Sequence, residues 1–509
     1  MPAKTSNDKI GAEKSSKLSG KFEVPVGWVK ELNFFDITGE KAKTKGTSSK
    51  FYHIEIKVYA DGNIQLYTEY GPTGTNSPAK EYRHFGKDRT RAEVEFNKIV
   101  KSKVKKGYNE IDVAQRAFGS EEAKKQTKAV ILKNADDLIK TTSNLNSSQK
   151  EIVSLFFNAQ DTWVAQTLKC PLGQLSNNQI DLGRAVLDEA KIVVNATKIL
   201  DKTDLDKIDE LTNRFYGLIP HNHGMGARGQ MTELRLDSLD KIVGKESDLD
   251  TLLDAKQVNA VLKQDSSIDD KYRSLNCDFD EVSVGSDLFR FLSGYFDGSK
   301  VSGHGFGSAK VSRIWSMRRK DAKECAFLSN AEKIAKECGK HTFATDAGRL
   351  SSGKSKLWTP DNRLDIDNDQ KCLFKNANVW LVWHGTRSAN LVGITRRGLL
   401  IRPTGAAYTG SMMGDGKYFG WQSTKSLNYC DGGYWTGGKR HSSKFMFLLD
   451  AAFGNMYHQS TPHFFKKPPT GYHSVYGKAG INLYNDEMVT YDNDDKNNQS
   501  SIRFLLEII

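Results

Sequence analysis

Apolar and polar residues alternate along two neighbouring stretches near the start of the chain. The segments FYHIEIKVYA (51–60) and NIQLYTEY (63–70) are joined by an Asp-Gly pair, which is typical of a β-hairpin with one buried face. Thr90 and Glu93 then have the spacing of a capping box at the start of a helix. Apolar residues recur at helical spacing after them, at Phe96, Ile99, Val100 and Val104. The pattern predicts a small sheet with one helix, ending near residue 115.

Helical spacing replaces this alternation between about residues 147 and 270. The segments QIDLGRAVLDEAKIVV (179–194) and DKIDELTNRFYGLI (206–219) carry apolar residues at the period of a helix. Pro171 and the turn from Pro220 to Gly226 interrupt the pattern, as helix breakers do. This part of the chain is therefore predicted to be a bundle of helices.

Short apolar runs rich in glycine and aromatic residues predict strands from about residue 280 onward. The clearest runs are VWLVWHG (379–385), KFMFLLDAAFG (444–454) and SIRFLLEII (501–509). Helical patches such as SDLFRFLSGYF (286–296) interrupt them. Residues 322–375 are polar and weakly patterned, so the pattern assigns them no structure.

Charge is unevenly distributed along the 509 residues. Of the formal net charge of +12, residues 1–150 contribute +9, because they hold 28 Lys and Arg against 19 Asp and Glu. Such a basic segment suits a polyanionic partner, and nucleic acid is the obvious one. A solvated face with a Lys-rich tail explains the same charge equally well.

Composition also argues against several classes of protein. No stretch approaches the roughly 18 consecutive apolar residues of a membrane span, and the N-terminus lacks the apolar core of a secretory signal. The six cysteines form no CxxC pair, so a zinc ribbon is not expected and the thiols are predicted to be free. We therefore expect a multidomain protein without a membrane partner or a metal site.

Three separated segments towards the C-terminus carry the candidate chemistry. They are VWHGTRSANLVGITRRGL (382–399), GDGKYFGWQSTKSLNYC (414–430) and YNDEMVTYD (484–492). Each places a functional side chain at the end of a strand-like run or in a glycine-rich turn, where binding residues often lie.

Taken singly, His384, Tyr418 and Glu487 each fit a purely structural role. Together they resemble the His-Tyr-Glu signature of the poly(ADP-ribose) polymerases. HGTRSAN resembles the family pattern H-G-[ST]-R-x-x-N, and GDGKYF followed by STKSLNYC resembles G-x-G-x-Y-F and S-K-S-x-N-Y-C. AFGNMY and GYHSVYGK follow in the family's order, and the similarity runs almost continuously from about residue 380 to 509.

Earlier stretches resemble the domains that accompany this signature in DNA-dependent members. CPLGQLSNNQI (170–180) and LTNRFYGLIPHNHG (211–224) resemble the helical regulatory domain, and YTEYGPTGTN (67–76) with EYRHFGKDRTRAEVEFNKIV (81–100) resembles the WGR domain. The resemblance implies a multidomain α+β protein with an antiparallel-sheet-plus-helix WGR domain, an all-α regulatory bundle, and a mixed α/β ADP-ribosyltransferase domain built on antiparallel sheets. The expected parts are a basic disordered tail (1–45), a WGR-like DNA-binding domain (46–115), a linker (116–146), the regulatory domain (147–275) and the catalytic domain (280–509).

The resemblance further implies that NAD+ is the substrate, and that His384, Tyr418 and Glu487 are catalytic. His384 is expected to bind the adenosine ribose, and Glu487 to bind the nicotinamide ribose and polarise the acceptor. Breaking a glycosidic bond to a cationic pyridinium develops an oxocarbenium-like ribose, which a nearby carboxylate stabilises. The same carboxylate can activate the acceptor, and no metal is required.

The remaining site residues are also implied by the resemblance. Tyr418 and Tyr429 are expected to sandwich the nicotinamide ring, and Gly385 and Ser426 to bind its carboxamide. Further NAD-binding positions are expected at Thr386, Asn390 and Arg402. In the regulatory domain, the helix expected at residues 248–262 carries Asp250, Leu252 and Leu253, which are expected to restrict access of NAD+ until DNA binds.

Two departures from the family pattern affect its partners. The family's Trp-Gly-Arg is Tyr70-Gly71-Pro72 here. Pro72 has neither charge nor N–H donor, so the family's Arg contact to DNA or to the helical domain is either missing or supplied by another residue. The expected DNA-binding residues are Lys80, Arg83, Lys87, Arg89 and Arg91, which fit a solvated basic face equally well. The loop before Glu487 is very short, and Asp486 is one extra residue in it, so polymer elongation is less certain than cleavage of NAD+.

The resemblance therefore implies a DNA-activated ADP-ribosyltransferase of the DNA damage response that builds poly(ADP-ribose) on protein acceptors and on itself. Its expected location is the nucleus in a eukaryote, and otherwise the cytosol or nucleoid. A mono-ADP-ribosyltransferase and a catalytically silent scaffold that binds DNA ends remain the alternatives.

Overall fold

The computed structural model describes most of the chain, in separate segments. The described residues are 16–38, 41, 47–73, 75, 77–111, 143–168, 172, 175–196, 199–222, 232–262, 266–320, 323–339, 361, 363–401, 412–433, 443–492 and 498–509. The chain divides into two compact units, residues 1–133 with 162–256 (the N-terminal unit) and residues 134–161 with 257–509 (the C-terminal unit).

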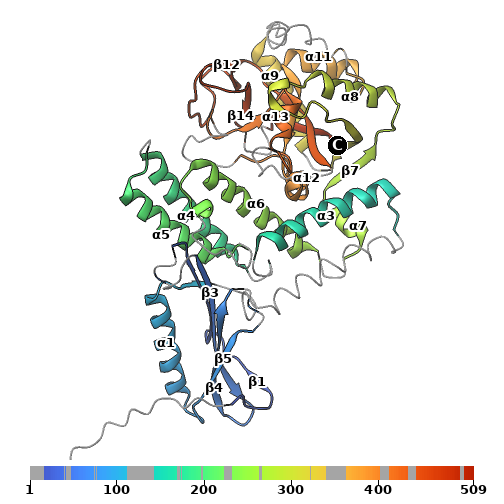
Figure 1. The fold of residues 1–509 in the computed structure, drawn as a ribbon. Coiled ribbons are helices and arrows are strands. Elements are labelled where there is room, and N and C mark those ends of the chain that lie inside the picture. Colours follow the sequence, from blue (N-terminus) through green and yellow to red (C-terminus); the bar gives the residue numbers. More distant parts are fainter. Residues whose placement is uncertain are drawn as a thin grey trace, which may run out of the picture. The chain divides into compact units, whose positions relative to one another are not determined.

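An antiparallel sheet forms the first part of the N-terminal unit (Figure 1). Its strands run in the order β5-β4-β3-β2-β6, and β1 pairs with β3. They are β1 (Phe22–Glu23), β2 (Val29–Asp36), β3 (Ser48–Tyr59), β4 (Ile64–Pro72), β5 (Ala79–His84) and β6 (Asn109–Ile111). The predicted hairpin is confirmed, since β3 and β4 pair with Tyr52 opposite Tyr70. Gly62 in its turn has a φ of +81°, a conformation that favours glycine.

Strand β2 lies in the segment expected to be a disordered tail. Its Leu32, Phe34 and Phe35 are almost completely buried, and its backbone pairs with β3 and β6. The run ELNFFDI therefore forms an interior strand between β3 and β6, because burial of its apolar side chains in the core offsets the entropic cost of ordering the segment.

Helix α1 (Arg89–Lys105) lies along one face of this sheet (Figure 1). The predicted capping box of Thr90 and Glu93 is wrong, because the helix begins earlier and Asp88 caps it by accepting a hydrogen bond from the backbone N–H of Arg91 (3.0 Å). Its Phe96 and Val100 are buried against the sheet, as predicted. Val104 was expected on that face but is largely exposed, because the apolar stripe ends one turn earlier.

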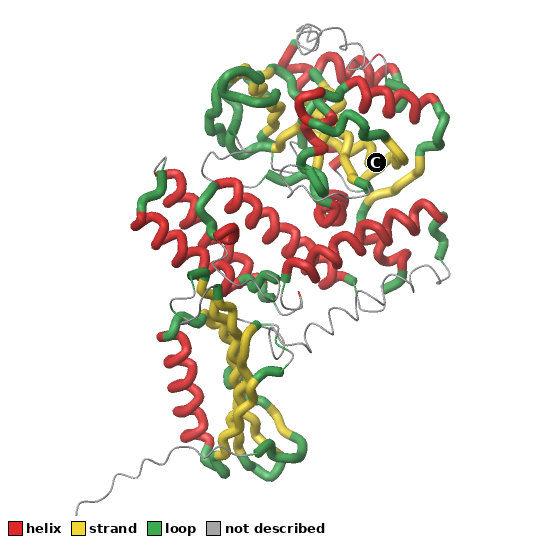
Figure 2. The backbone as a smooth tube through the Cα atoms, in the orientation of Figure 1, coloured by secondary structure: helices red, strands yellow, loops and turns green. Residues whose placement is uncertain are grey.

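The bundle predicted from helical spacing is confirmed (Figure 2). Its helices are α3 (Ser147–Thr167), α4 (Asn177–Ala196), α5 (Lys202–Leu218) and α6 (Leu239–Val261), with the short η2 (Thr232–Leu234) before α6. Helix α6 starts well before the predicted residue 248, because Ile242 belongs to the same buried cluster as Leu249 and Leu252. Helix α5 also contacts β2, where the Asn33 side chain donates to the carbonyl of Gly217 (3.1 Å).

Two antiparallel-rich sheets build the C-terminal unit. The first has the order β7-β8-β15-β11-β9 and the second the order β10-β14-β13-β12, in which β12 and β13 are parallel. The first contains β7 (Cys277–Glu281), β8 (Val311–Arg319), β15 (Ser500–Ile508), β11 (Lys444–Ala452) and β9 (Val379–Gly385), and the second contains β10 (Lys417–Phe419), β14 (Glu487–Thr490), β13 (Ser474–Gly477) and β12 (Met456–Gln459). The strands predicted at 379–385, 444–454 and 501–509 are thus confirmed. The α+β class is confirmed with them.

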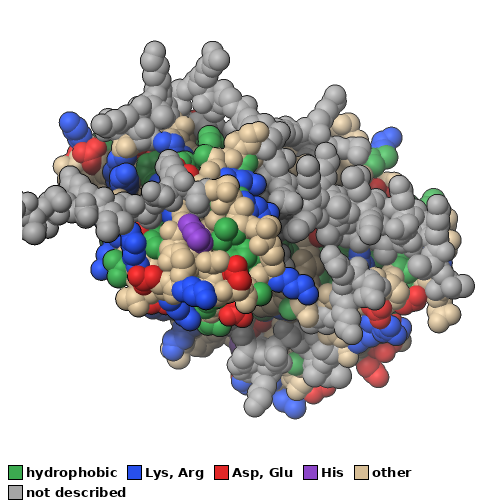
Figure 3. All heavy atoms as spheres, turned by 90° about the horizontal axis from the view of Figure 1, so that it is seen from below, with side chains coloured by type: hydrophobic (Ala, Val, Ile, Leu, Met, Phe, Trp, Pro, Cys, Tyr) green, Lys and Arg blue, Asp and Glu red, His purple; other side chains and the backbone are tan. Residues whose placement is uncertain are grey.

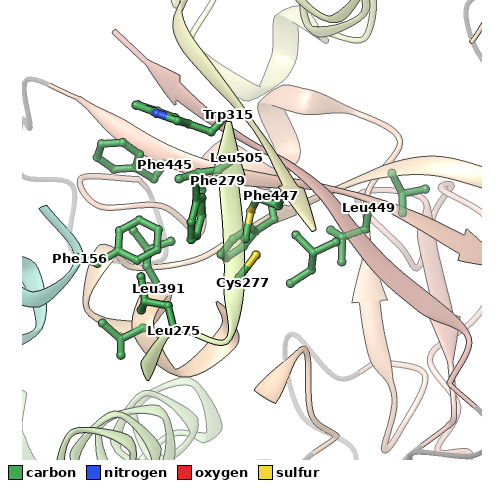
Figure 4. Packing of buried hydrophobic residues seen from close by; sticks show 14 of the residues in the cluster. Phe156, Leu275, Cys277, Phe279, Trp315, Leu391, Phe445, Phe447, Leu449 and Leu505 are labelled. Carbon is green, nitrogen blue, oxygen red and sulfur yellow. The ribbon is translucent and has the colours of Figure 1, made fainter. Parts of the chain in front are cut away.

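The core of this unit joins the sheet to helices from distant parts of the sequence. Figure 4 shows Phe279, Trp315 and Phe447 of the sheet beside Phe156 of α3 and Leu391 of α12 (Leu391–Arg397). The buried side chains at the start of α3 therefore pack with the strands. Further helices of this unit are α7 (Ile268–Ser274), α8 (Asp287–Gly298), η3 (Ser302–His304), η6 (Ser388–Asn390) and α13 (Ser423–Leu427).

In the described parts of the polar segment 322–375, and one residue beyond it, lie two helices that the pattern did not predict, α9 (Lys323–Cys338) and α11 (Asn368–Asn376). Their buried Phe327 and Phe374 face each other with ring centroids 6.0 Å apart and form a small separate cluster. Few apolar residues are needed to form this small cluster, so the helical periodicity of apolar residues is weak in this part of the sequence. Among the described helices, none has the length and hydropathy needed to cross a membrane.

Candidate active site

The candidate site lies where the two sheets of the C-terminal unit are joined by backbone hydrogen bonds. Trp383 of β9 exchanges both backbone hydrogen bonds with Gly420, which follows β10, at 2.8 and 3.0 Å. Strand β10 in turn pairs with β14, where Phe419 lies opposite Met488. The ends of β9, β10 and β14 are thereby held together, and each carries one residue of the predicted His-Tyr-Glu set.

His384 and Tyr418 are brought into contact by this arrangement. The Nδ1 of His384 lies 3.2 Å from the backbone carbonyl of Tyr418, so this nitrogen carries the proton and donates. The Tyr418 hydroxyl donates to the carbonyl of Gly414 (2.8 Å) and accepts from the backbone N–H of Met413 (2.9 Å). Both bonds fix the orientation of the Tyr418 ring.

Gly385 follows His384 and lies directly against α13. A Cβ placed at Gly385 would stand 1.8 Å from the backbone carbonyl oxygen of Ser426, so no larger residue fits there without moving the helix. The Ser426 hydroxyl donates to the carbonyl of Trp383 (3.3 Å). The backbone of Gly385 and the side chain of Ser426 are thus neighbours, as the predicted carboxamide site requires. Tyr429 lies just beyond α13 and is half-buried.

Glu487 begins β14 and forms an ion pair with Lys425 of α13. The two side chains meet at 2.6 Å, and the same Lys425 ammonium donates to the carbonyl of Asp486, also at 2.6 Å. Burial raises the pKa of Glu487 above its ordinary value, while the adjacent Lys425 lowers it and the carboxylate of Asp486 raises it. Lys425 was not predicted as a site residue, since no sequence spacing links two side chains that lie 62 positions apart.

The short loop between β13 and β14 is held at both ends. The carboxylate of Asp486, the extra residue noted in the sequence, accepts from the Trp421 indole N–H (2.7 Å) and from the backbone N–H of Ala479 (2.8 Å). Asn485 hydrogen-bonds the Nε2 of His304, whose Nδ1 lies 3.2 Å from the hydroxyl of Thr424 on α13. His304 was also missed, because it lies in an unremarkable Gly-rich stretch far from the three signature segments.

The remaining predicted NAD-binding residues are Thr386, Asn390 and Arg402. The Asn390 side chain donates to the Thr386 hydroxyl (3.0 Å), so both lie on the short turn after β9. Arg402 lies outside the described residues. Among the part of the chain that the structure describes, no group of three or more His, Cys, Asp or Glu could hold a metal ion.

The predicted regulatory and DNA-binding residues lie in the N-terminal unit, and each is described there. On α6, Leu252 is fully buried, Leu253 is partly buried, and Asp250 forms an ion pair with Arg184 of α4 (2.7 Å). In the WGR-like part, Arg83 pairs with Glu95 and with Glu81, and Arg89 pairs with Glu93. The side chains of Lys80, Lys87 and Arg91 are exposed.

Three family models match successive parts of the chain. They are the WGR domain (residues 35–115), the poly(ADP-ribose) polymerase regulatory domain (143–279) and the poly(ADP-ribose) polymerase catalytic domain (308–502). Poly [ADP-ribose] polymerase 1 of Gallus gallus is 28% identical over 69% of this chain and 29% of its own length. Poly [ADP-ribose] polymerase 2-B of Oryza sativa is 25% identical over 83% of this chain and 59% of its own length. Poly [ADP-ribose] polymerase of Drosophila melanogaster is 23% identical over 91% of this chain and 42% of its own length.

The matched region thus spans between 29 and 59% of the length of these relatives. The order of the three matched domains is the order expected from the sequence resemblance. The chain belongs to the poly(ADP-ribose) polymerase family.

Proposed function

We propose that the chain is an NAD+ ADP-ribosyltransferase that releases nicotinamide, transfers ADP-ribose to protein acceptors, including itself, and builds poly(ADP-ribose) on them. The observation that supports this most is the convergence of His384, Tyr418 and Glu487 on one junction of two sheets. The contact between Lys425 and Glu487 adds to it, because it holds a carboxylate in a partly desolvated position at that junction. There a fixed negative charge acts more strongly than in water.

The proposed binding mode uses the neighbouring groups of β9 and α13. Gly385 offers a backbone N–H and carbonyl, and Ser426 a hydroxyl, on one side of the junction, which matches the donors and acceptor of a carboxamide. The ring of Tyr418, oriented by its bonded hydroxyl, presents an aromatic face to the nicotinamide ring, and Tyr429 presents the second. Fixing the leaving group in this way lowers the entropic cost of reaching the transition state.

The reaction that follows from this placement begins with cleavage of the bond between the nicotinamide nitrogen and the ribose. The bonding electron pair leaves with nicotinamide, which becomes neutral, and positive charge develops on the ribose ring. The carboxylate of Glu487 stabilises that charge and orients the acceptor nucleophile, which then bonds to the anomeric carbon and loses its proton.

Transfer of a single ADP-ribose unit is the second candidate. The loop before Glu487 is short, and two hydrogen bonds to Asp486 and one to Asn485 hold it in place. A short, fixed loop offers little surface to the end of a growing polymer. Sizing of the products by gel electrophoresis separates the candidates, since polymer gives a ladder of increasing mass and single transfer gives one small mass increase.

Nicotinamide is expected to inhibit the enzyme, and Tyr418→Ala is expected to weaken both nicotinamide inhibition and NAD+ binding. The reason is that alanine removes the aromatic face on which the ring stacks. Inhibition curves and the KM for NAD+ measure the two effects. Tyr418→Phe is the matched control, because it keeps the ring and loses only the hydroxyl bonds to Met413 and Gly414. Absence of inhibition at millimolar nicotinamide would contradict the proposed site.

Activation by broken DNA is part of the same proposal, with a role in the DNA damage response and a nuclear location in a eukaryotic cell. The WGR domain match and the basic N-terminal part of the sequence support it. On the face shown in Figure 3, however, the described Lys and Arg side chains are interspersed with Asp and Glu. Net charge alone therefore does not locate a DNA site on that face, and individual contacts have to be considered.

A further inference from the structure

Three lysines gather at the open end of the β3–β4 hairpin of the WGR-like sheet. Lys103 lies on the last turn of α1, Lys106 caps that helix, and Lys50 lies on β3. In the strand register Lys50 is directly opposite Pro72, the position at which the family pattern has its arginine. The charge that is missing at residue 72 is therefore present on the neighbouring strand.

Aromatic rings hold this cluster together. The ammonium group of Lys103 lies 3.7 Å from the ring centroid of Tyr52, and 5.4 and 5.3 Å from those of Tyr70 and Tyr108. The Tyr52 and Tyr70 rings are stacked with centroids 5.2 Å apart. An ammonium group over aromatic faces is attracted to them, which fixes Lys103 at this end of the hairpin.

The cluster extends to Lys50 through a second pair of rings. Phe34 lies 5.2 Å from Tyr108, and the Lys50 ammonium lies 6.0 Å from the Phe34 ring. Both lysines are half-buried, whereas Lys106 is exposed. The rings therefore connect the two half-buried lysines along one side of the sheet.

The positive charges of the cluster are not neutralised by ion pairs. None of the three lysines pairs with a carboxylate among the residues that the structure describes, whereas Arg83 and Arg89 of the originally expected set do. Burial, Lys106 and Lys50 together lower the pKa of Lys103 to about 8, and the nearby Glu81 acts in the opposite direction. Like charges held at one place are destabilising until an anion joins them.

We propose that Lys50, Lys103 and Lys106 form a phosphate-binding site for the DNA backbone at the open end of the β3–β4 hairpin, which carries Tyr70 and Pro72. This inference rests on the proposed DNA binding and specifies which side chains carry it. A DNA phosphate supplies the negative charge that the cluster lacks, and each lysine that contacts a phosphate adds to affinity and to its salt dependence. Such contacts position the duplex without reading its sequence.

The first test measures DNA affinity by fluorescence anisotropy, with the full chain and a fluorescein-labelled blunt duplex over a range of salt concentrations. The double variant Lys50→Ala/Lys106→Ala is expected to lower affinity at least tenfold, and to reduce the slope of log K against log salt by about 1 to 2. Lys101→Ala is the matched control, because this exposed lysine of the same helix lies outside the cluster. It is expected to leave both quantities within twofold of wild type.

The second test measures how DNA affinity depends on pH, through the protonation of Lys103. A bound phosphate favours its charged form, so affinity is expected to be constant below about pH 7 and to fall up to about tenfold by pH 9. Lys103→Arg keeps its charge throughout this range and is expected to remove most of that fall. The tyrosines around it do not interfere, since burial raises the pKa of Tyr52 and brings that of Tyr108 to about 12, and a hydrogen bond to Glu81 raises that of Tyr70. The other charged groups near the cluster are Glu81 and Arg83.

The outcomes distinguish the inference from the function on which it rests. The lysine site is overturned, and DNA binding stands, if wild type binds DNA and the double variant loses no more affinity than Lys101→Ala. This holds whether both variants lose affinity equally or both keep it. An unchanged pH dependence in Lys103→Arg also counts against the site. If the folded wild-type chain binds no DNA at low salt, the proposed DNA binding itself is wrong.

Discussion

Replacing Glu487 with Gln is expected to lower the rate of ADP-ribose transfer about 10²- to 10³-fold while leaving NAD+ binding nearly intact. Glutamine keeps the size of the side chain and loses the charge that stabilises the developing positive ribose. It also breaks the ion pair with Lys425, although that ammonium keeps its bond to the Asp486 carbonyl. Single-turnover transfer of labelled ADP-ribose and a separate measurement of NAD+ affinity test the two parts of this expectation.

The neighbouring carboxylate provides the control for this prediction. Asp486 is already engaged by the Trp421 indole and the Ala479 N–H, so Asp486→Asn is expected to reduce transfer much less than Glu487→Gln. A transfer rate of the Glu487→Gln enzyme within twofold of wild type would show that another carboxylate is the catalytic group. A greater loss in Asp486→Asn than in Glu487→Gln would identify Asp486 as that group.

Leu252→Ala is expected to lower the melting temperature and to raise cleavage of NAD+ in the absence of DNA. Leu252 is fully buried in the bundle, and truncation of such a leucine typically costs about 2–5 kcal/mol. We propose that this bundle restricts access of NAD+ until DNA binds, and the cost is comparable to the several kcal/mol that invert a two-state population. Differential scanning calorimetry and nicotinamide release without DNA measure the two effects.

Leu253→Ala is the matched control on the same helix. Leu253 is only partly buried against the cluster, so both its loss of melting temperature and its gain of DNA-free activity are expected to be smaller. If Leu252→Ala lowers the melting temperature and DNA-free turnover does not rise, the leucine has only a structural role and the proposed restraint has to be abandoned.

Residues that pack within one element could be predicted from the sequence. The alternation at 51–70 identified the β3–β4 hairpin, and the helical period identified α4 and α5, because each pattern reflects a single buried face. Boundaries were less predictable. The start of α1 depends on Asp88 accepting a backbone N–H, and the Thr90 and Glu93 pair fits the capping pattern equally well in sequence.

Contacts between distant segments could not be predicted in this way. The resemblance named Glu487, but the Lys425 ammonium beside it and the His304–Asn485 bond behind it join residues 62 and 181 positions apart. The lysine cluster likewise depends on the register that places Lys50 opposite Pro72. These pairings arise from strand order and loop placement, which no local pattern of residues specifies.

The most direct test of the central claim measures nicotinamide release and covalent labelling together, with and without broken DNA. The full chain is incubated with NAD+ labelled in its adenosine half, and denatured protein is then assayed for label. The account predicts that nicotinamide is released, that label stays on denatured protein, and that broken duplex DNA raises both. Label that depends on DNA but forms no ladder would assign single transfer. If a folded chain that binds DNA neither releases nicotinamide nor becomes labelled, the account is contradicted and the chain is a catalytically silent DNA-end-binding scaffold.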